Sequence, residues 1–172
     1  MKLKIKHGLS KTVVTTPEKQ PLFIIKNKAF LSTEKIILNP DGTEAYSIKK
    51  DPKPLDSRDK YIFTDHATKN EFYAWVDCDI YKRVKAIPFF KFFFFSPFEI
   101  FIEAESFFGE LCIKRGSISS FDIFLNGKKH GAITGKSIVC DSIDDAALLT
   151  VLYAFTDYIS STEENYRTED IV

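Results

Sequence analysis

The sequence predicts a mainly β protein, a closed antiparallel β-barrel around one central hydrophobic α-helix near the C-terminus. Two observations predict this class. Short strand-like runs separated by turn sequences continue through most of the 172 residues. They are followed by Ala146–Phe155, where only Thr150 is polar, whereas a helix with one solvated face shows polar residues every three or four positions. A two-sheet sandwich has no room for a helix that is wrapped on all sides, but a wide barrel does.

The central helix is expected to span about residues 143–159. Its continuous apolar part, about 10–12 residues, is too short to cross a bilayer, which takes about 20, so no transmembrane segment is expected. The following residues, 161–172, are acidic and have few apolar side chains, so a flexible tail is expected there. The predicted organisation is therefore one barrel domain over residues 1–160, followed by this tail.

The strands are predicted from alternation and from turn residues. Lys2–Lys6 alternates with period two, and Leu22–Lys28 is a short β-branched and aromatic run. Asn126-Gly127 between alternating runs is the strongest local signal for a hairpin. The four predicted hairpins are Lys35–Asn39 with Glu44–Lys49, Tyr61–Phe63 with Glu71–Val76, Phe98–Glu103 with Gly109–Ile113, and Phe121–Leu125 with His130–Thr134.

Charge is balanced overall but uneven along the chain. Lys+Arg and Asp+Glu each number 24, so a nucleic-acid partner is not expected. Residues 1–60 carry 13 basic and 7 acidic side chains, whereas residues 137–172 carry one basic and 8 acidic. Two interpretations stay open: the two ends lie close together and neutralise each other, or the chain has a basic face for anionic partners.

The three cysteines, Cys78, Cys112 and Cys140, are widely spaced and form no metal-binding or disulfide pattern. They are typical of a reducing compartment. The N-terminal residues lack the continuous apolar stretch of a signal peptide. A cytoplasmic location is therefore expected.

Phe89–Phe95 has the sequence FFKFFFF, so a strand here would be apolar on both faces. One face can pack on the central helix, and the other needs a cover. Three covers are considered: the N-terminal segment of the same chain, a second subunit or protein partner, or a lipid surface. Phe90, Phe92 and Phe94 are the candidate interaction surface.

Two basic clusters are candidates for contact with an anion or lipid. One precedes the phenylalanine run and consists of Lys82, Arg83 and Lys85. The other, Lys128 and Lys129, lies in the turn of the fourth hairpin. An anionic membrane attracts such clusters, but basic side chains also protect ordinary strand edges.

No catalytic, metal or cofactor motif is present, and the three histidines lie apart in the sequence. The chain is therefore expected not to be an enzyme and to need no cofactor. One alternative is an enzyme or small-ligand carrier with a pocket at the barrel mouth. The polar side chains expected to line that pocket are Tyr61, His66, Asp77, Asp79 and His130. Another alternative is a structural oligomer that associates through the Phe89–Phe95 strand.

Residues Leu22–Lys50 resemble the opening hairpins of the LURP-one-related and tubby C-terminal-like proteins. The matching positions are Ile25, Lys26, Lys28, Phe30 and Ser32, then Ile37, Asp41, Gly42, Tyr46 and Ile48. The C-terminal run DDAALLTVLYAFTDYI is similar to the hydrophobic helix that threads the barrel in this superfamily, which also includes the phospholipid scramblases.

This resemblance covers most of residues 3–160 and implies a twelve-stranded closed barrel, in a family usually without a demonstrated catalytic site. Tubby domains bind phosphoinositides through basic side chains on strands, but no matching basic motif is found in this chain. The scramblases have a longer apolar C-terminal helix. The expected function is a non-enzymatic binding or scaffolding module that contacts an anionic membrane surface or a protein partner.

Overall fold

The computed structural model describes residues 1–29, 32–51, 60–77, 99–103, 111–117, 120–143 and 145–169. These ranges form strands and one helix, α2 (Ala146–Glu169). The strands are β1 (Lys2–His7), β2 (Thr12–Thr15), β3 (Pro21–Asn27), β4 (Lys35–Leu38), β5 (Glu44–Lys50), β6 (Lys60–Asp65), β7 (Asn70–Asp77), β8 (Glu99–Glu103), β9 (Leu111–Ser117), β10 (Ser120–Leu125), β11 (Lys128–Thr134) and β12 (Ser137–Cys140).

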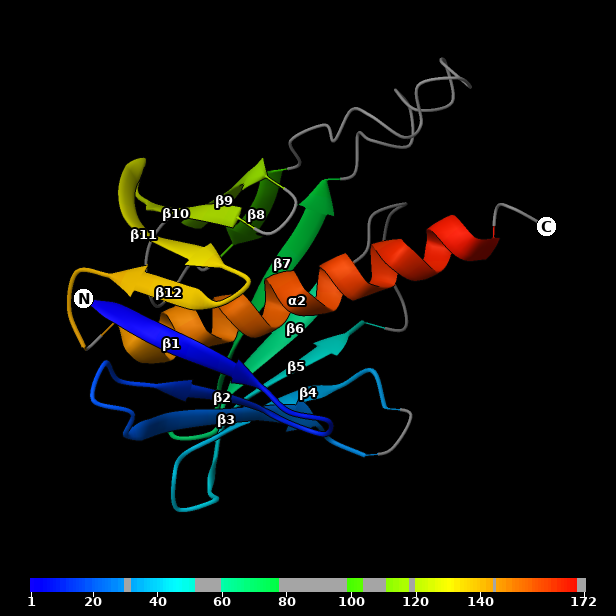
Figure 1. Cartoon of the computed structure of the whole chain (residues 1–172). Helices are drawn as coiled ribbons and strands as arrows, with labels where there is room; N and C mark the ends of the chain where they lie inside the picture. The colour runs from blue at the N-terminus through cyan, green and yellow to red at the C-terminus, as the bar shows by residue number, and fades with distance from the viewer. Residues whose placement is uncertain are drawn as a thin grey trace.

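Neighbouring strands in the sequence are also neighbours in the sheet, and every pairing is antiparallel. The first strand, β1, pairs with β2 on one side and with β12 on the other, so the strand order closes on itself. Figure 1 shows the strands arranged around α2, with the N-terminus beside the end of β12 and the start of the helix. The prediction of a mainly β antiparallel fold with one C-terminal helix is confirmed.

The register of β1 separates apolar from charged side chains. Leu3 lies opposite Ile138, and Ile5 lies opposite Val14, all four buried in the core. Because successive side chains of a strand point to opposite faces, Lys2, Lys4 and Lys6 project from the outer face, where they are exposed. A shift by one residue would bury the lysines, so the hydrophobic core fixes this register.

The tight turns agree with their sequences. Asn126 and Gly127 have φ values of 50° and 74°, the left-handed conformations that a two-residue hairpin turn requires. Gly42, between β4 and β5, has a φ of 89°. The first, second and fourth predicted hairpins are confirmed as β4–β5, β6–β7 and β10–β11, and the strands of the third pair as β8–β9. The connection between these two strands lies outside the described residues.

Helix α2 supplies the centre of the core. Leu149, Leu152 and Phe155 have no solvent exposure. The Phe155 ring meets those of Tyr61 and Phe63 edge to face, each with 5.0 Å between ring centroids. Side chains on several sides of the helix are therefore buried at once, as its apolar sequence predicts. Thr150 is also fully buried, and its hydroxyl has no hydrogen-bond partner in the described part of the chain.

The helix boundaries differ from the predicted ones. The helix begins at Ala146 rather than near Ile143, and it continues to Glu169 rather than ending near Ile159. The acidic segment, expected to be a flexible tail from residue 161, is therefore helical through Glu169. Residues 160–169 contain neither Gly nor Pro, and adding residues to an existing helix is much easier than starting one.

Two strands were missed, β2 (Thr12–Thr15) and β12 (Ser137–Cys140). Each has only four residues, too few for a pattern of alternation to stand out. Both pair with β1 on one side, and β2 pairs with β3 and β12 with β11 on the other. The pairing of β12 with β1 joins the two ends of the chain, which no local sequence pattern indicates.

We expect Leu152→Ala to lower the free energy of unfolding by about 2–5 kcal/mol, because it leaves a cavity where no solvent can enter. Lys49→Ala, on an exposed outer position of β5, should change it by less than about 0.5 kcal/mol. Urea unfolding of both variants checks this. Equal stability of Leu152→Ala and the parent would show that α2 does not lie in the core.

Gly131→Ala should also destabilise the protein. A Cβ at position 131 would lie 2.7 Å from the carbonyl oxygen of Val139 and 3.1 Å from Leu149 Cδ1. The strand, its neighbour or the helix would have to move, at a cost of about 1–3 kcal/mol. Thermal melting measures the loss, with Gly127→Ala testing the separate effect of a positive φ, since nothing lies within 4 Å of that position. A Gly131→Ala variant that melts with the parent would refute the close approach.

Candidate functional site

Lys128 and Lys129, one of the two predicted basic clusters, begin β11 and are exposed. Lys129 forms an ion pair with Asp122, with 2.8 Å between Nζ and Oδ1. Both lysines line an open hollow of about 340 Å³ together with Leu125, Asn126, His130 and Asp141. The ion pair and the carboxylate of Asp141 offset much of the positive charge here, so this hollow is a weak site for anions.

Beside the hollow, His130 contacts Asp145 just before helix α2, with 2.9 Å between Nε2 and Oδ1. The other carboxylate oxygen of Asp145 accepts hydrogen bonds from the Ser142 N–H and hydroxyl. Burial acts to raise the pKa of Asp145, but the Ser142 and His130 hydrogen bonds and the His130 charge lower it below its usual 3.8. This cluster joins β11 to the start of α2, and both carboxylate oxygens of Asp145 have partners within it.

The other predicted contact residues, Lys82, Arg83 and Lys85, lie outside the described residues. The same holds for the phenylalanine run with Phe90, Phe92 and Phe94, and for Asp79. Predictions about these residues therefore remain untested.

The described members of the predicted mouth pocket are not brought together. Tyr61 is buried and packs against Phe155 and Tyr158 in the core. His66 follows β6, and His130 lies on β11, five steps away in the strand order. Asp77 ends β7. Tyr61, His66 and His130 therefore do not line one polar pocket.

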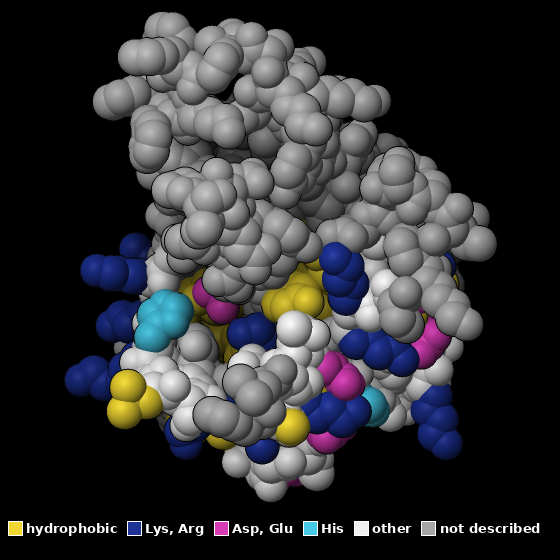
Figure 2. Space-filling view, turned by 90° about the vertical axis from the view of Figure 1, so that its right-hand side faces the viewer, with side chains coloured by type: hydrophobic (Ala, Val, Ile, Leu, Met, Phe, Trp, Pro, Cys, Tyr) yellow, Lys and Arg dark blue, Asp and Glu magenta, His cyan; other side chains and the backbone are white. Residues whose placement is uncertain are grey.

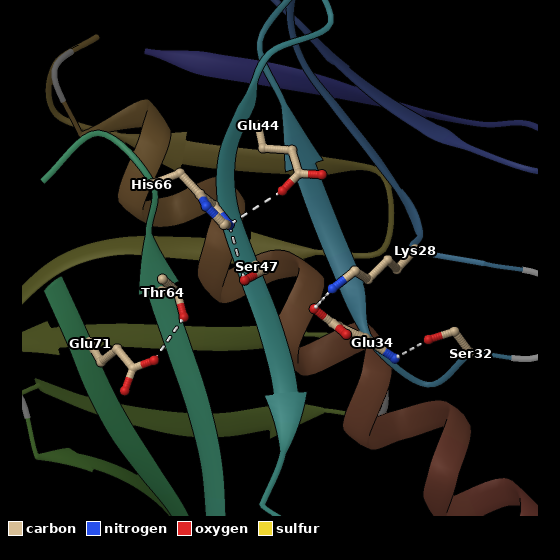
Figure 3. A network of polar contacts seen from close by, with 8 residues as sticks. All are labelled: Lys28, Ser32, Glu34, Glu44, Ser47, Thr64, His66 and Glu71. Carbon is tan, nitrogen blue, oxygen red and sulfur yellow. Dashed lines mark hydrogen bonds and ion pairs between the residues drawn. The ribbon is translucent and has the colours of Figure 1, made fainter. Parts of the chain in front are cut away.

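Glu44, Ser47 and His66 place the three residue types of a hydrolytic triad near one another (Figure 3). However, both contacts use the same histidine nitrogen: Nε2 lies 3.2 Å from Ser47 Oγ and 3.5 Å from Glu44 Oε2. In a triad the acid orients one ring nitrogen, and the other nitrogen takes the serine proton. One nitrogen cannot serve both roles, so the geometry does not activate Ser47.

The remaining polar contacts of Figure 3 tie neighbouring strands together. Lys28 and Glu34 form an ion pair at 2.9 Å across the β3–β4 connection, and Thr64 donates a hydrogen bond to Glu71 across β6–β7. No group of three or more potential metal ligands occurs among the described residues. These contacts have a structural explanation.

Within the described residues, a group of exposed lysines without ion-pair partners lies on and beside the outer side of β1. We call the exposed lysines there and beside it the β1 face: Lys2, Lys4, Lys6, Lys11 and Lys136. The sequence contains no Asp or Glu in residues 1–17 or 130–140, which form β1, β2, most of β11 and β12. None of the five lysines forms an ion pair with a described carboxylate. The charge asymmetry of the sequence therefore becomes a basic face.

Two exposed apolar side chains, Leu9 and Val139, lie next to these lysines. Among the described residues, the exposed large hydrophobic side chains are Met1, Leu9, Val139 and Ile143. Val139 lies directly opposite Lys2 on the neighbouring strand, and Leu9 lies in the β1–β2 connection. Figure 2, which views the end of the barrel where that connection lies, shows cationic side chains along one edge with a hydrophobic side chain and a histidine beside them.

Sequence reasoning found the basic excess of residues 1–60 but did not select these lysines. The alternation of Lys2–Lys6 was the available signal, because it predicts one charged outer face. The competing interpretation, neutralisation of the two ends, also has one example, a 4.0 Å ion pair between Lys35 and Asp157 of α2. That contact lies on β4, away from the β1 face.

Three comparisons with known proteins give no assignment: no family model, no curated protein and no solved structure matches this chain. Within the ranges that the structure describes, no helix combines the length and the apolar character that crossing a bilayer requires.

Asp145→Asn should make stability less dependent on pH in the acid range. The folded-state pKa of Asp145 is lowered from 3.8, so its charged form stabilises the fold above that pH and loses its effect as pH falls through the lower, folded value. The parent should exceed the variant by about 1–2 kcal/mol near pH 6, and the difference should shrink toward pH 2. Urea unfolding across this range measures it.

Asp141→Asn is the matched control, since it removes one exposed carboxylate from the same segment. A parent-minus-variant difference for Asp145→Asn that stays constant from pH 6 to pH 2 would contradict the role of the charged carboxylate.

Proposed function

We propose that this chain is a non-enzymatic binding module with a tubby-like closed barrel, and that it docks on an anionic membrane surface through the β1 face. The observation that carries the proposal is the set of five exposed lysines on a surface whose strands contain no acidic residue. A protein of zero net charge can still bind an anionic surface if one face concentrates its cations.

The expected free energy of attraction between the lysines and an anionic membrane is sufficient for reversible docking. Each basic side chain close to an anionic membrane contributes about 1 kcal/mol, so five give about 5 kcal/mol before the cost of association. The attraction should weaken with salt, because the Debye length falls from about 10 Å at 0.1 M to about 3 Å at 1 M. Such docking would be transient and dependent on the lipid composition.

The membrane is preferred over a nucleic acid because exposed aliphatic side chains, rather than stacked aromatic ones, accompany the lysines. The cytoplasmic leaflet carries the anionic lipids of a cell, which fits the cytoplasmic location expected from the sequence. The lack of a productive triad at Glu44, Ser47 and His66 supports a binding role over a hydrolytic one.

The alternatives from the sequence keep less support. A ligand carrier with a pocket at the barrel mouth is disfavoured by the position of Tyr61 in the core. An oligomer through Phe89–Phe95 stays a prediction that sedimentation of the parent chain can test.

We expect Lys4→Glu/Lys6→Glu to lower binding to phosphatidylserine-containing vesicles at least about 30-fold, since losing two attractions removes about 2 kcal/mol and the new charges repel. Co-sedimentation with these vesicles and with pure phosphatidylcholine vesicles, at low and high salt, measures the effect. The parent should pellet with the acidic vesicles alone, and less at high salt.

Lys49→Glu/Lys69→Glu makes the same change in charge at exposed positions on β5 and in the β6–β7 turn, across the barrel from β1. This control should bind like the parent. Equal loss in both double variants would point to net charge rather than to the β1 face. If the parent protein does not sediment with acidic vesicles, the membrane proposal is wrong and a protein partner is left as the ligand.

A further inference from the structure

The exposed apolar side chains occupy both ends of the β1 face. Leu9 lies at one end, in the four-residue connection between β1 and β2, and is fully exposed. Val139 and Ile143, exposed by 42% and 49%, lie at the other end, where β12 finishes and the chain turns toward α2. Between them run Lys2, Lys4 and Lys6.

The distance between the two ends follows from the strand. Six residues of β1 at about 3.3 Å each separate them by roughly 20 Å. Outer side chains on one strand recur about every 7 Å, so the three lysines of β1 fill this interval evenly. The surface is therefore an elongated strip with cations in the middle and apolar groups at its ends.

Both ends are held by hydrogen bonds to the barrel. The Gly8 N–H donates to the Lys11 carbonyl at 2.8 Å and closes the tip that carries Leu9. His7 Nε2 lies 2.9 Å from the carbonyl oxygen of Gly135, which ties the same tip to the β11–β12 turn. At the other end, the Cys140 N–H donates to the Met1 carbonyl at 3.0 Å. Ordered anchors lose little conformational entropy on binding.

Single exposed hydrophobic residues are common on protein surfaces and need no explanation. Here Leu9 and Val139 lie at the two ends of a row of lysines on β1, a strand without acidic residues, and the exposed Asp141 follows Val139 only after β12 has ended. Apolar side chains flanked by lysines match the boundary between anionic headgroups and acyl chains. An acidic protein would satisfy the lysines but would gain less from isolated aliphatic groups about 20 Å apart.

We propose that the β1 face lies flat on an anionic bilayer, with Leu9 inserted at one end and Val139 and Ile143 at the other. This inference rests on the proposed membrane docking and adds its orientation: β1 lies parallel to the membrane plane. In the competing orientation, the barrel would stand on the β1–β2 tip. Only Leu9 would then enter the bilayer, and Lys2 and Val139 would be held away from it.

Three variants distinguish the two orientations: Leu9→Ser, Val139→Thr and Ile143→Ser. Partitioning onto phosphatidylserine-containing vesicles is measured for each by co-sedimentation, with thermal melting to confirm folding. Leu9→Ser should lower the partition coefficient about ten-fold, which corresponds to about 1.4 kcal/mol of lost apolar burial. Val139→Thr and Ile143→Ser should each lower it about three-fold, because these side chains are only half exposed.

Ile62→Thr is the matched control for Val139→Thr, since Ile62 is a partly exposed outer residue of β6 on the opposite side of the barrel. It should bind like the parent. Loss confined to Leu9→Ser would show docking by the tip and overturn the flat orientation, while the lysine dependence of binding would stand. If all three variants bind like the parent, the contact is purely electrostatic, and the flat orientation is also overturned. Failure of the parent to bind, or full binding by Lys4→Glu/Lys6→Glu, would instead overturn the proposed function.

Discussion

The burial of helix α2 is the constraint on which the rest of this structure depends. Leu149, Leu152 and Phe155 are removed from water together, and strands from both halves of the chain supply the surrounding side chains. Each strand must therefore point its apolar side chains toward the helix, and period two then assigns the alternate residues to the outside. The exposure of the lysines on β1 is a consequence of this packing.

Much of the fold follows from local sequence. The helix is recognisable because Ala146–Phe155 has no polar face, and the β10–β11 hairpin because Asn126-Gly127 readily adopts the two positive φ values that its turn requires. The short strands β2 and β12 could not be recognised in the same way. Each is held between two neighbouring strands, and for β12 one of these, β1, is more than 130 residues away in the sequence.

The same limit applies to the candidate site. Lys128 and Lys129 were selected because they are adjacent in the sequence, but an ion pair with Asp122 compensates one of them. The β1 face combines Lys4 with Lys136 and Val139, and only the closing pair of strands brings these residues together. Composition showed that the N-terminal part is basic. It could not show which lysines would lie together on strands without acidic residues, because that depends on long-range register.

The alternation of β1 also separates stability from binding. Leu3 and Ile5 fill the core and fix the pairing with β12 and β2, whereas Lys2, Lys4 and Lys6 make no contact that the core requires. Changes at the lysines should therefore leave folding nearly intact, since exposed substitutions usually alter stability by less than about 0.5 kcal/mol. A binding surface on the outer side of β1 can therefore vary without changing the core. This separation is why binding, rather than stability, is the property that reports on the β1 face.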